Sequence, residues 1–169
     1  IVKATLEQLV EKKFEFKAVG LFDVIEHIEE VEAFLKELKQ ILTPNATVFI
    51  TVPAYQSLWS AEDEEAGHYR RYNLKMAKKQ LETAGYKLID HSYFFSVLPL
   101  PIYLKRALKA DLGVAKKEDY FLPENIVGKF IRSIFWIEKK LLASKIRIPF
   151  GSSLFLVAQV DPRIEMNLI

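Results

Sequence analysis

Apolar residues along the chain alternate between strand-like runs and helix-like periods. Residues 16–22 and 47–52 are mostly apolar without strict alternation, which is typical of strands covered on both faces in a parallel sheet. Between them, residues 31–42 carry apolar side chains at three- and four-residue intervals, as a helix with one buried stripe does. The order strand, helix, strand predicts a layered α/β domain.

Beyond the second strand the sequence predicts a long polar loop at residues 54–72 and then another helix. Asn73 is a suitable N-cap for this helix, and Gly85 suits the position just past its end. The remaining predicted elements are strands at residues 86–95 and 153–160 and helices at residues 102–110 and 125–144. Residues 6–13 are short and polar and give no clear pattern.

These elements form one predicted domain over residues 1–161, followed by a tail at 162–169. The sheet is expected to be mainly parallel. A helical insertion, about residues 97–148, joins the last two strands in place of a single crossover helix. We therefore expect the last strand to be antiparallel.

Composition narrows the possible functions. The net charge of +2 gives no electrostatic case for nucleic acid as a partner. The chain has no cysteine, which excludes disulfides and thiolate metal sites. Charged residues interrupt the N-terminal segment, and no apolar stretch approaches the ~20 residues that span a bilayer. The expected location is the cytoplasm.

The charge is unevenly distributed, because residues 102–147 hold eleven Lys/Arg against five Asp/Glu. Residues 97–142 combine these basic residues with apolar and aromatic ones, which indicates either a pad that contacts a membrane surface or a helical layer on the core or a dimer interface. A peripheral membrane location therefore stands beside the cytoplasmic one.

Three phrases then resemble one family in the right order. They are FKAVGLFDVIEHI at residues 16–28, LTPN at 42–45 and LETAGY at 81–86. They are similar to the fourth strand and its turn, the entry to the fifth strand, and the helix-to-sixth-strand phrase of class I S-adenosylmethionine-dependent methyltransferases. The resemblance implies a Rossmann-like three-layer sandwich, methyl transfer, and S-adenosylmethionine as cofactor. Asn45 stands where the family has glycine, a mild departure because Asn tolerates the left-handed conformation.

The larger departure lies at the N-terminus. The family's glycine-rich cofactor loop and the acidic residue that holds the ribose do not occur among the 169 residues. Glycine is needed in that loop because the backbone approaches the cofactor closely. On the family's map the chain begins near the third strand, so the resemblance implies that the N-terminal βα units are missing from it.

The resemblance also assigns the cofactor contacts. Leu21, Phe22 and Asp23 occupy the positions that line the methionine and adenine portions of S-adenosylmethionine. Gly20 would permit close backbone approach, and Thr5 and Leu6 correspond to the adenine-edge contact. The alternative for Leu21 and Phe22 is ordinary core packing.

Asp23, Glu26 and His27 form a compact group of two acids and an imidazole. If the turn is helical, Asp23 and His27 share a face. The group is compatible with a general base (His27 oriented by a carboxylate), a divalent metal site, or a solvated turn. Methyl transfer requires no metal, and we assign no metal ligand. The candidate catalytic residues are His27, Glu26 and His68.

The segment 60–72 places an acidic run beside aromatic and basic residues, a composition that suits a lid over a substrate. Alternatively, its arginines simply pair with the acidic run. The candidate substrate-binding residues are Tyr55, Tyr69, Arg70, Arg71 and Tyr72.

The functional prediction is methyl transfer to a small-molecule or lipid-like acceptor. The alternative is a non-catalytic, truncated methyltransferase-fold domain that acts by dimerisation or partner binding. In the family's strand order, loss of the first strand would uncover residues 17–22, and an unpaired apolar edge invites a homodimer.

Overall fold

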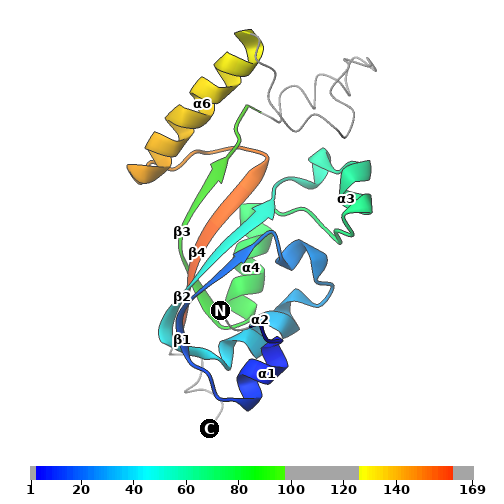
Figure 1. Cartoon of the computed structure of the whole chain (residues 1–169), viewed down its shortest axis with the longest axis vertical. Helices are drawn as coiled ribbons and strands as arrows, with labels where there is room; N and C mark the ends of the chain where they lie inside the picture. The colour runs from blue at the N-terminus through cyan, green and yellow to red at the C-terminus, as the bar shows by residue number, and fades with distance from the viewer. Residues whose placement is uncertain (1–2, 98–125, 162–169) are drawn as a thin grey trace. The chain divides into compact units, whose positions relative to one another are not determined.

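The computed structural model describes residues 3–97 and 126–161 (Figure 1). The chain divides into two compact units. One unit comprises Ile1–His91 with Leu154–Ile169, and the other comprises Ser92–Ser153. The predicted helix at 102–110 and the tail at 162–169 lie outside the described residues.

The centre of the fold is a four-stranded sheet with the order β1-β2-β4-β3. Strands β1 and β2 are parallel, with Gly20 opposite Phe49. The last strand along the chain, β4, is antiparallel, which confirms the predicted α/β class with a mainly parallel sheet. The strands are β1 (Phe16–Phe22), β2 (Leu42–Pro53), β3 (Tyr86–Phe94) and β4 (Ser153–Val160).

Three helices of the first unit lie on one side of the sheet in Figure 1. Helix α1 (Leu6–Glu11) starts in a capping box between Thr5 and Gln8. Helix α2 (Val31–Lys39) and helix α4 (Leu74–Thr83) contact each other. Asn73 caps α4 by accepting from the Met76 N–H at 2.9 Å, as predicted.

The helix-covered face of the sheet holds the core. Alternate residues of β2 and β4 are fully buried, among them Val48, Ile50 and Leu156, whereas the side chains between them are half-buried. Among the described residues, one face of these two strands is therefore more deeply buried than the other. Tyr86 is buried in this core, and its hydroxyl donates a hydrogen bond to the Leu35 carbonyl at 2.8 Å.

The boundary between α2 and β2 differs from the prediction. The helix ends at Lys39 and the strand begins at Leu42, so the extended conformation starts five residues before the predicted 47. The Phe16 N–H donates to the Ile41 carbonyl at 2.8 Å, which pairs this segment with the start of β1. Asn45 adopts φ +63° there, the left-handed conformation expected of it.

In the second unit, helix α6 (Ile126–Ala143) corresponds to the predicted helix at 125–144. Its single acid, Glu138, is 5% exposed and accepts from the backbone N–H of Phe95 at 2.9 Å and of Ser96 at 2.8 Å. This carboxylate anchors α6 to the segment that follows β3. Among the described residues, no helix has the length and apolar character needed to cross a membrane.

Candidate functional site

Two neighbouring strands, β1 and β2, end in left-handed backbone conformations. Asp23 follows β1 with φ +52°, and Tyr55 follows β2 with φ +60° and ψ +112°. The Asp23 N–H donates to the Thr51 carbonyl and hydroxyl at 3.1 Å each, and the Thr51 hydroxyl donates to the Asp23 carboxylate at 3.1 Å. Such conformations in non-glycine residues are uncommon and concentrate at functional sites.

The segment 54–72, predicted as a loop, is folded, and its two ends pair with each other. Ala54 bridges Tyr72, and the Tyr55 N–H donates to the Tyr72 carbonyl at 2.7 Å. The segment contains two short helices, η2 (Gln56–Leu58) and α3 (Ala61–Glu65). Its far end returns to the first turn after β1, where the Tyr69 N–H donates to the Glu26 carbonyl at 2.8 Å.

Asp63 holds this folded segment together. Its carboxylate is 1% exposed and accepts from Arg71 Nε at 2.8 Å and from the Ser60 N–H at 2.9 Å. His68 Nδ1 lies 2.8 Å from the same carboxylate. Burial raises the pKa of Asp63, but the hydrogen bonds from Arg71, His68 and Ser60 outweigh it and hold the pKa below its usual value. The acid is therefore ionised near neutral pH.

Glu26 lies beside this arrangement, but its pKa is shifted in the opposite direction to that of Asp63. It belongs to η1 (Ile25–His27), the turn after β1, and its side chain is 0% exposed. Within the part of the chain that the structure describes, neither carboxylate oxygen has a hydrogen-bond partner. Burial raises the pKa of Glu26 and outweighs the opposing effect of its own nearby backbone N–H, which does not reach hydrogen-bond geometry. The Asp23 carboxylate also raises this pKa, whereas His27 and His68 lower it.

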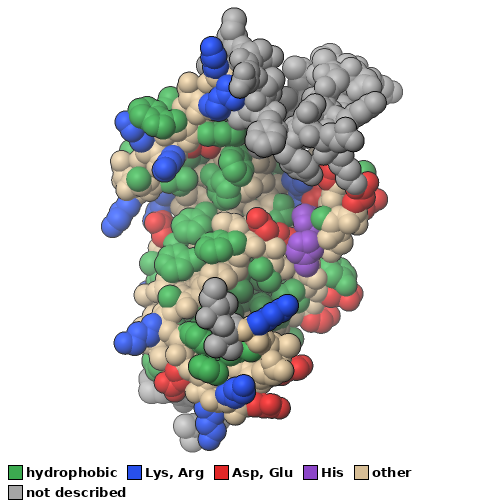
Figure 2. Space-filling view, viewed as in Figure 1, with side chains coloured by type: hydrophobic (Ala, Val, Ile, Leu, Met, Phe, Trp, Pro, Cys, Tyr) green, Lys and Arg blue, Asp and Glu red, His purple; other side chains and the backbone are tan. Residues whose placement is uncertain are grey.

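The structure brings the three candidate catalytic residues together. One ligand-capable atom each of Glu26, His27 and His68 lies within 4.8 Å of the others. The two imidazole rings meet edge to face with centroids 4.6 Å apart. Figure 2 shows histidine side chains gathered at one spot beside acidic ones. Asp23 is directed to Thr51 instead, because η1 is a 3₁₀ turn and gives Asp23 no shared α-helical face with His27.

The candidate substrate-binding residues have different environments. Tyr69 is 53% exposed, and the Arg70 guanidinium lies 5.8 Å from the centre of its ring. Arg70 also donates to the Glu29 carbonyl at 2.8 Å. Arg71 is paired with Asp63, and Tyr72 is fully buried with its hydroxyl donating to the Ile25 carbonyl at 3.2 Å. Tyr55 lies where the two ends of the segment 54–72 pair.

The candidate cofactor contacts on β1 are divided between core and surface. Phe22 is 61% exposed, whereas Leu21 is 6% exposed and packs in the core. A Cβ added at Gly20 would come within 2.7 Å of the Phe22 ring, so the space that the glycine leaves is filled by that ring.

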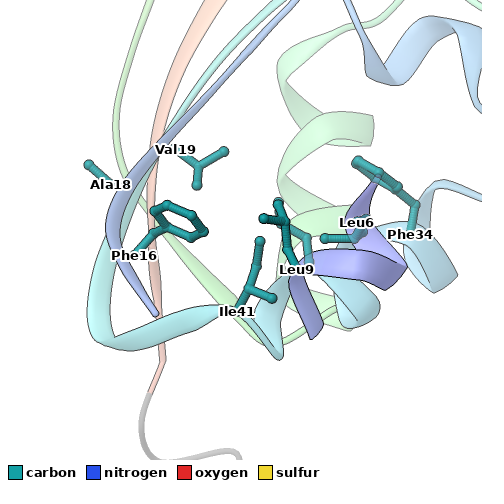
Figure 3. A pocket seen from close by; sticks show the side chains of 8 residues that line it. Leu6, Leu9, Phe16, Ala18, Val19, Phe34 and Ile41 are labelled. Atoms are coloured by element: carbon teal, nitrogen blue, oxygen red, sulfur yellow. The ribbon is translucent and has the colours of Figure 1, made fainter. Parts of the chain in front are cut away.

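Thr5 and Leu6 lie at the start of α1, where Thr5 is the N-cap. Leu6 lines an apolar cavity of about 350 Å³ between α1, α2 and β1. Figure 3 shows Phe16 and Val19 of β1 facing Leu9 and Ile41 across it.

A family model described as "Methyltransferase domain" matches residues 3–91, which is 89 of the 169 residues. The chain belongs to this methyltransferase family. The matched range contains the whole β1-to-Tyr72 region described above. S-adenosylmethionine is the cofactor expected of the family.

The fold agrees with that of a solved structure, and weaker matches were found to others. A SAM-dependent methyltransferase from Archaeoglobus fulgidus matches 94% of this chain and 66% of its own at 18% identity and a TM-score of 0.51. The phosphoethanolamine N-methyltransferase 2 of Haemonchus contortus in complex with S-adenosyl-L-methionine matches 87% of this chain and 33% of its own (17%, TM-score 0.44). The [4+2]-cyclase SpnF matches 87% of this chain and 50% of its own at 14% identity and a TM-score of 0.47. The chain thus spans less than two-thirds of these structures. No curated protein sequence matches it.

Asp63 was not among the predicted site residues, although it belongs to the acidic run at 62–65. A signal for it exists, because Ser60 and Asp63 have the spacing of a capping box, with the N3 acid shortened from Glu to Asp. The interpretation of the arginines as partners of the acidic run holds for Arg71.

Proposed function

We propose that this methyltransferase domain serves methyl transfer from S-adenosylmethionine to a small-molecule or lipid-like acceptor. The family match over residues 3–91 carries the proposal. In doubly wound sheets, ligands bind beyond the carboxyl ends of the strands, and here those ends hold Asp23, Tyr55 and the Glu26 turn.

Residues at the end of β1 fit part of the cofactor. Phe22 offers an exposed aromatic face, and Asp23 offers a carboxylate whose direction is fixed by Thr51. Leu21 has its side chain in the core, so its contribution would come from the backbone. The bound cofactor supplies an electrophilic methyl group, and the protein contributes alignment of the acceptor with it.

An acceptor hydroxyl would need a base, and Glu26, His27 and His68 are the candidates. They lie on the turn after β1 and on the segment after β2, so one acceptor atom near the strand ends could reach them. Tyr69 and Arg70 lie next to His68 and offer an aromatic face and a cation for the rest of the acceptor.

Exposed side chains of α6 support a lipid-like acceptor. Trp136 is 58% exposed, Ile137 is 49% exposed, and Lys140 lies 3.6 Å from the centre of the Trp136 ring. Lys129 and Lys139 are also exposed, and Figure 2 shows basic side chains interspersed with hydrophobic ones over α6. Exposed aromatic and basic residues on one helix are typical of segments that rest on anionic lipid.

The test uses the natural polypeptide that carries this domain, with tritium-labelled S-adenosylmethionine and separate pools of cellular lipids and water-soluble metabolites. We expect label in an acceptor from one of these pools, and a loss of at least tenfold in Asp23→Ala. No transfer into either pool would contradict the proposal.

Vesicle flotation tests the α6 surface separately. We expect the protein to bind anionic vesicles and Trp136→Ala to weaken this binding at least fivefold. Ile89→Ser on β3 is the matched control, because Ile89 is also exposed (43%), and it should bind as the wild type does. Equal loss in both variants would contradict a specific role for α6.

A further inference from the structure

The Glu26 carboxylate is buried, and the described residues leave it without a hydrogen-bond donor or acceptor. It is 0% exposed, and neither of its oxygens has a hydrogen-bond partner among residues 3–97 and 126–161. An ionised carboxylate without a partner is costly to bury, and a protonated one still leaves a donor unsatisfied. The turn that carries it is held in place because the Glu26 carbonyl accepts from the Tyr69 N–H at 2.8 Å. A partner from outside the chain would satisfy these oxygens.

Two imidazoles stand at the same place. His27 follows Glu26 directly, and His68 is brought to it by the folded segment after β2. The ligand-capable atoms of all three residues lie within 4.8 Å of one another. Ligands of a single Zn²⁺ are about 3–4 Å apart at bond lengths near 2.0–2.2 Å. The exposed His27 side chain has room for the adjustment of about 1 Å that this difference requires.

His68 is also oriented as a metal ligand usually is. Its Nδ1 lies 2.8 Å from the Asp63 carboxylate, which leaves Nε2 with its lone pair directed elsewhere. Metal-binding histidines commonly donate their second ring N–H to a carboxylate that fixes the tautomer. Asp63 is itself held by Arg71 and Ser60, so this outer contact is rigid.

We propose that Glu26, His27 and His68 bind one divalent transition-metal ion, with Zn²⁺ as the best fit. Two imidazoles and one carboxylate match the ligand preference of Zn²⁺, whereas Mg²⁺ and Ca²⁺ prefer oxygen ligands throughout. Three protein ligands leave a fourth position for water or another small ligand, as in catalytic zinc sites. Asp63 acts as a positioning residue for His68.

The experiment is a calorimetric titration of chelator-treated protein with ZnCl₂. We expect one ion per chain, and Mg²⁺ in millimolar excess should compete weakly or not at all. The Co²⁺-loaded protein should show the visible absorption of a low-coordinate site. Glu26→Gln and His68→Gln should each weaken Zn²⁺ binding at least a hundredfold, and Asp63→Asn tenfold to a hundredfold.

His91→Gln is the matched control, because His91 is the third histidine of the chain and lies outside the group. Its Zn²⁺ affinity should equal that of the wild type. Metal-free Glu26→Gln should fold at least as stably as metal-free wild type, because it removes an unpaired buried acid. The proposal is overturned if the wild type shows no saturable Zn²⁺ binding, or if His91→Gln loses as much affinity as His68→Gln.

A side chain that binds Zn²⁺ is not free to accept a proton, so the metal site replaces the base role suggested above for these three residues but does not otherwise depend on the proposed methyl transfer. Zn²⁺ affinity is read without cofactor or acceptor, and methyl transfer is read by label. A failure of either proposal is therefore distinguishable from a failure of the other.

Discussion

Replacing Asp63 with Asn tests whether this acid holds the segment 54–72 in place. The carboxylate is 1% exposed and accepts from Arg71, His68 and Ser60. Arg71 is only 15% exposed, so the substitution leaves a poorly solvated cation without its counter-charge. Breaking a buried pair from one side costs about 3–5 kcal/mol. Because Asn keeps one acceptor oxygen, we expect a loss of about 2–4 kcal/mol in the free energy of unfolding at pH 7.

Urea denaturation followed by tryptophan fluorescence measures this loss. Glu82→Gln is the control, since Glu82 pairs with Lys78 at 3.6 Å with both side chains more than half exposed. Such a pair contributes about 0.5 kcal/mol or less. The reasoning is refuted if Asp63→Asn costs no more than Glu82→Gln.

The same substitution has a defined pH dependence. The folded-state pKa of Asp63 lies below the unfolded value, so its contribution is present above the unfolded pKa and disappears as the pH falls through the folded one. The difference between wild type and Asp63→Asn should therefore shrink in acid. A difference that grows on acidification would contradict the direction of the pKa shift.

Three further substitutions test local features of the fold. Gly151→Ala should lower stability by about 3 kcal/mol in thermal unfolding, because its Cβ would overlap the Phe94 backbone carbonyl, and an unchanged midpoint would contradict this contact. Asn45→Ala should cost about 1 kcal/mol at φ +63° while Asn45→Gly costs nothing, and equal effects in urea denaturation would argue against the left-handed conformation. Tyr72→Phe should cost about 1 kcal/mol through the lost bond to the Ile25 carbonyl. Burial raises the pKa of Tyr72 to about 12 from 10.0, so wild type should lose stability between those pH values more steeply than the variant.

Elements with a strong local sequence signal could be predicted well. Strand β1 has the predicted limits, and α4 begins after the Asn73 cap. Both signals reside within a few residues, as a mostly apolar run or as a cap followed by an amphipathic period. Helix α1 was not recognised because six residues give too few turns for a period, although Thr5 and Gln8 form a capping box.

The candidate site could be predicted less well from the sequence, because its geometry depends on long-range contacts. Local spacing favoured Asp23 as the neighbour of His27, but the left-handed turn at Asp23 directs its carboxylate to Thr51. His68 approaches Glu26 because the whole segment after β2 folds around Asp63. Neither arrangement has a periodic signature, since both arise from hydrogen bonds between residues far apart in the chain.

The most direct test of the methyltransferase function is calorimetric titration of the natural polypeptide carrying this domain with S-adenosylhomocysteine. We predict one site with a micromolar Kd, about −8 kcal/mol, that Asp23→Ala weakens at least tenfold while Glu82→Gln leaves it unchanged. Absence of saturable binding by the wild-type protein would contradict the account.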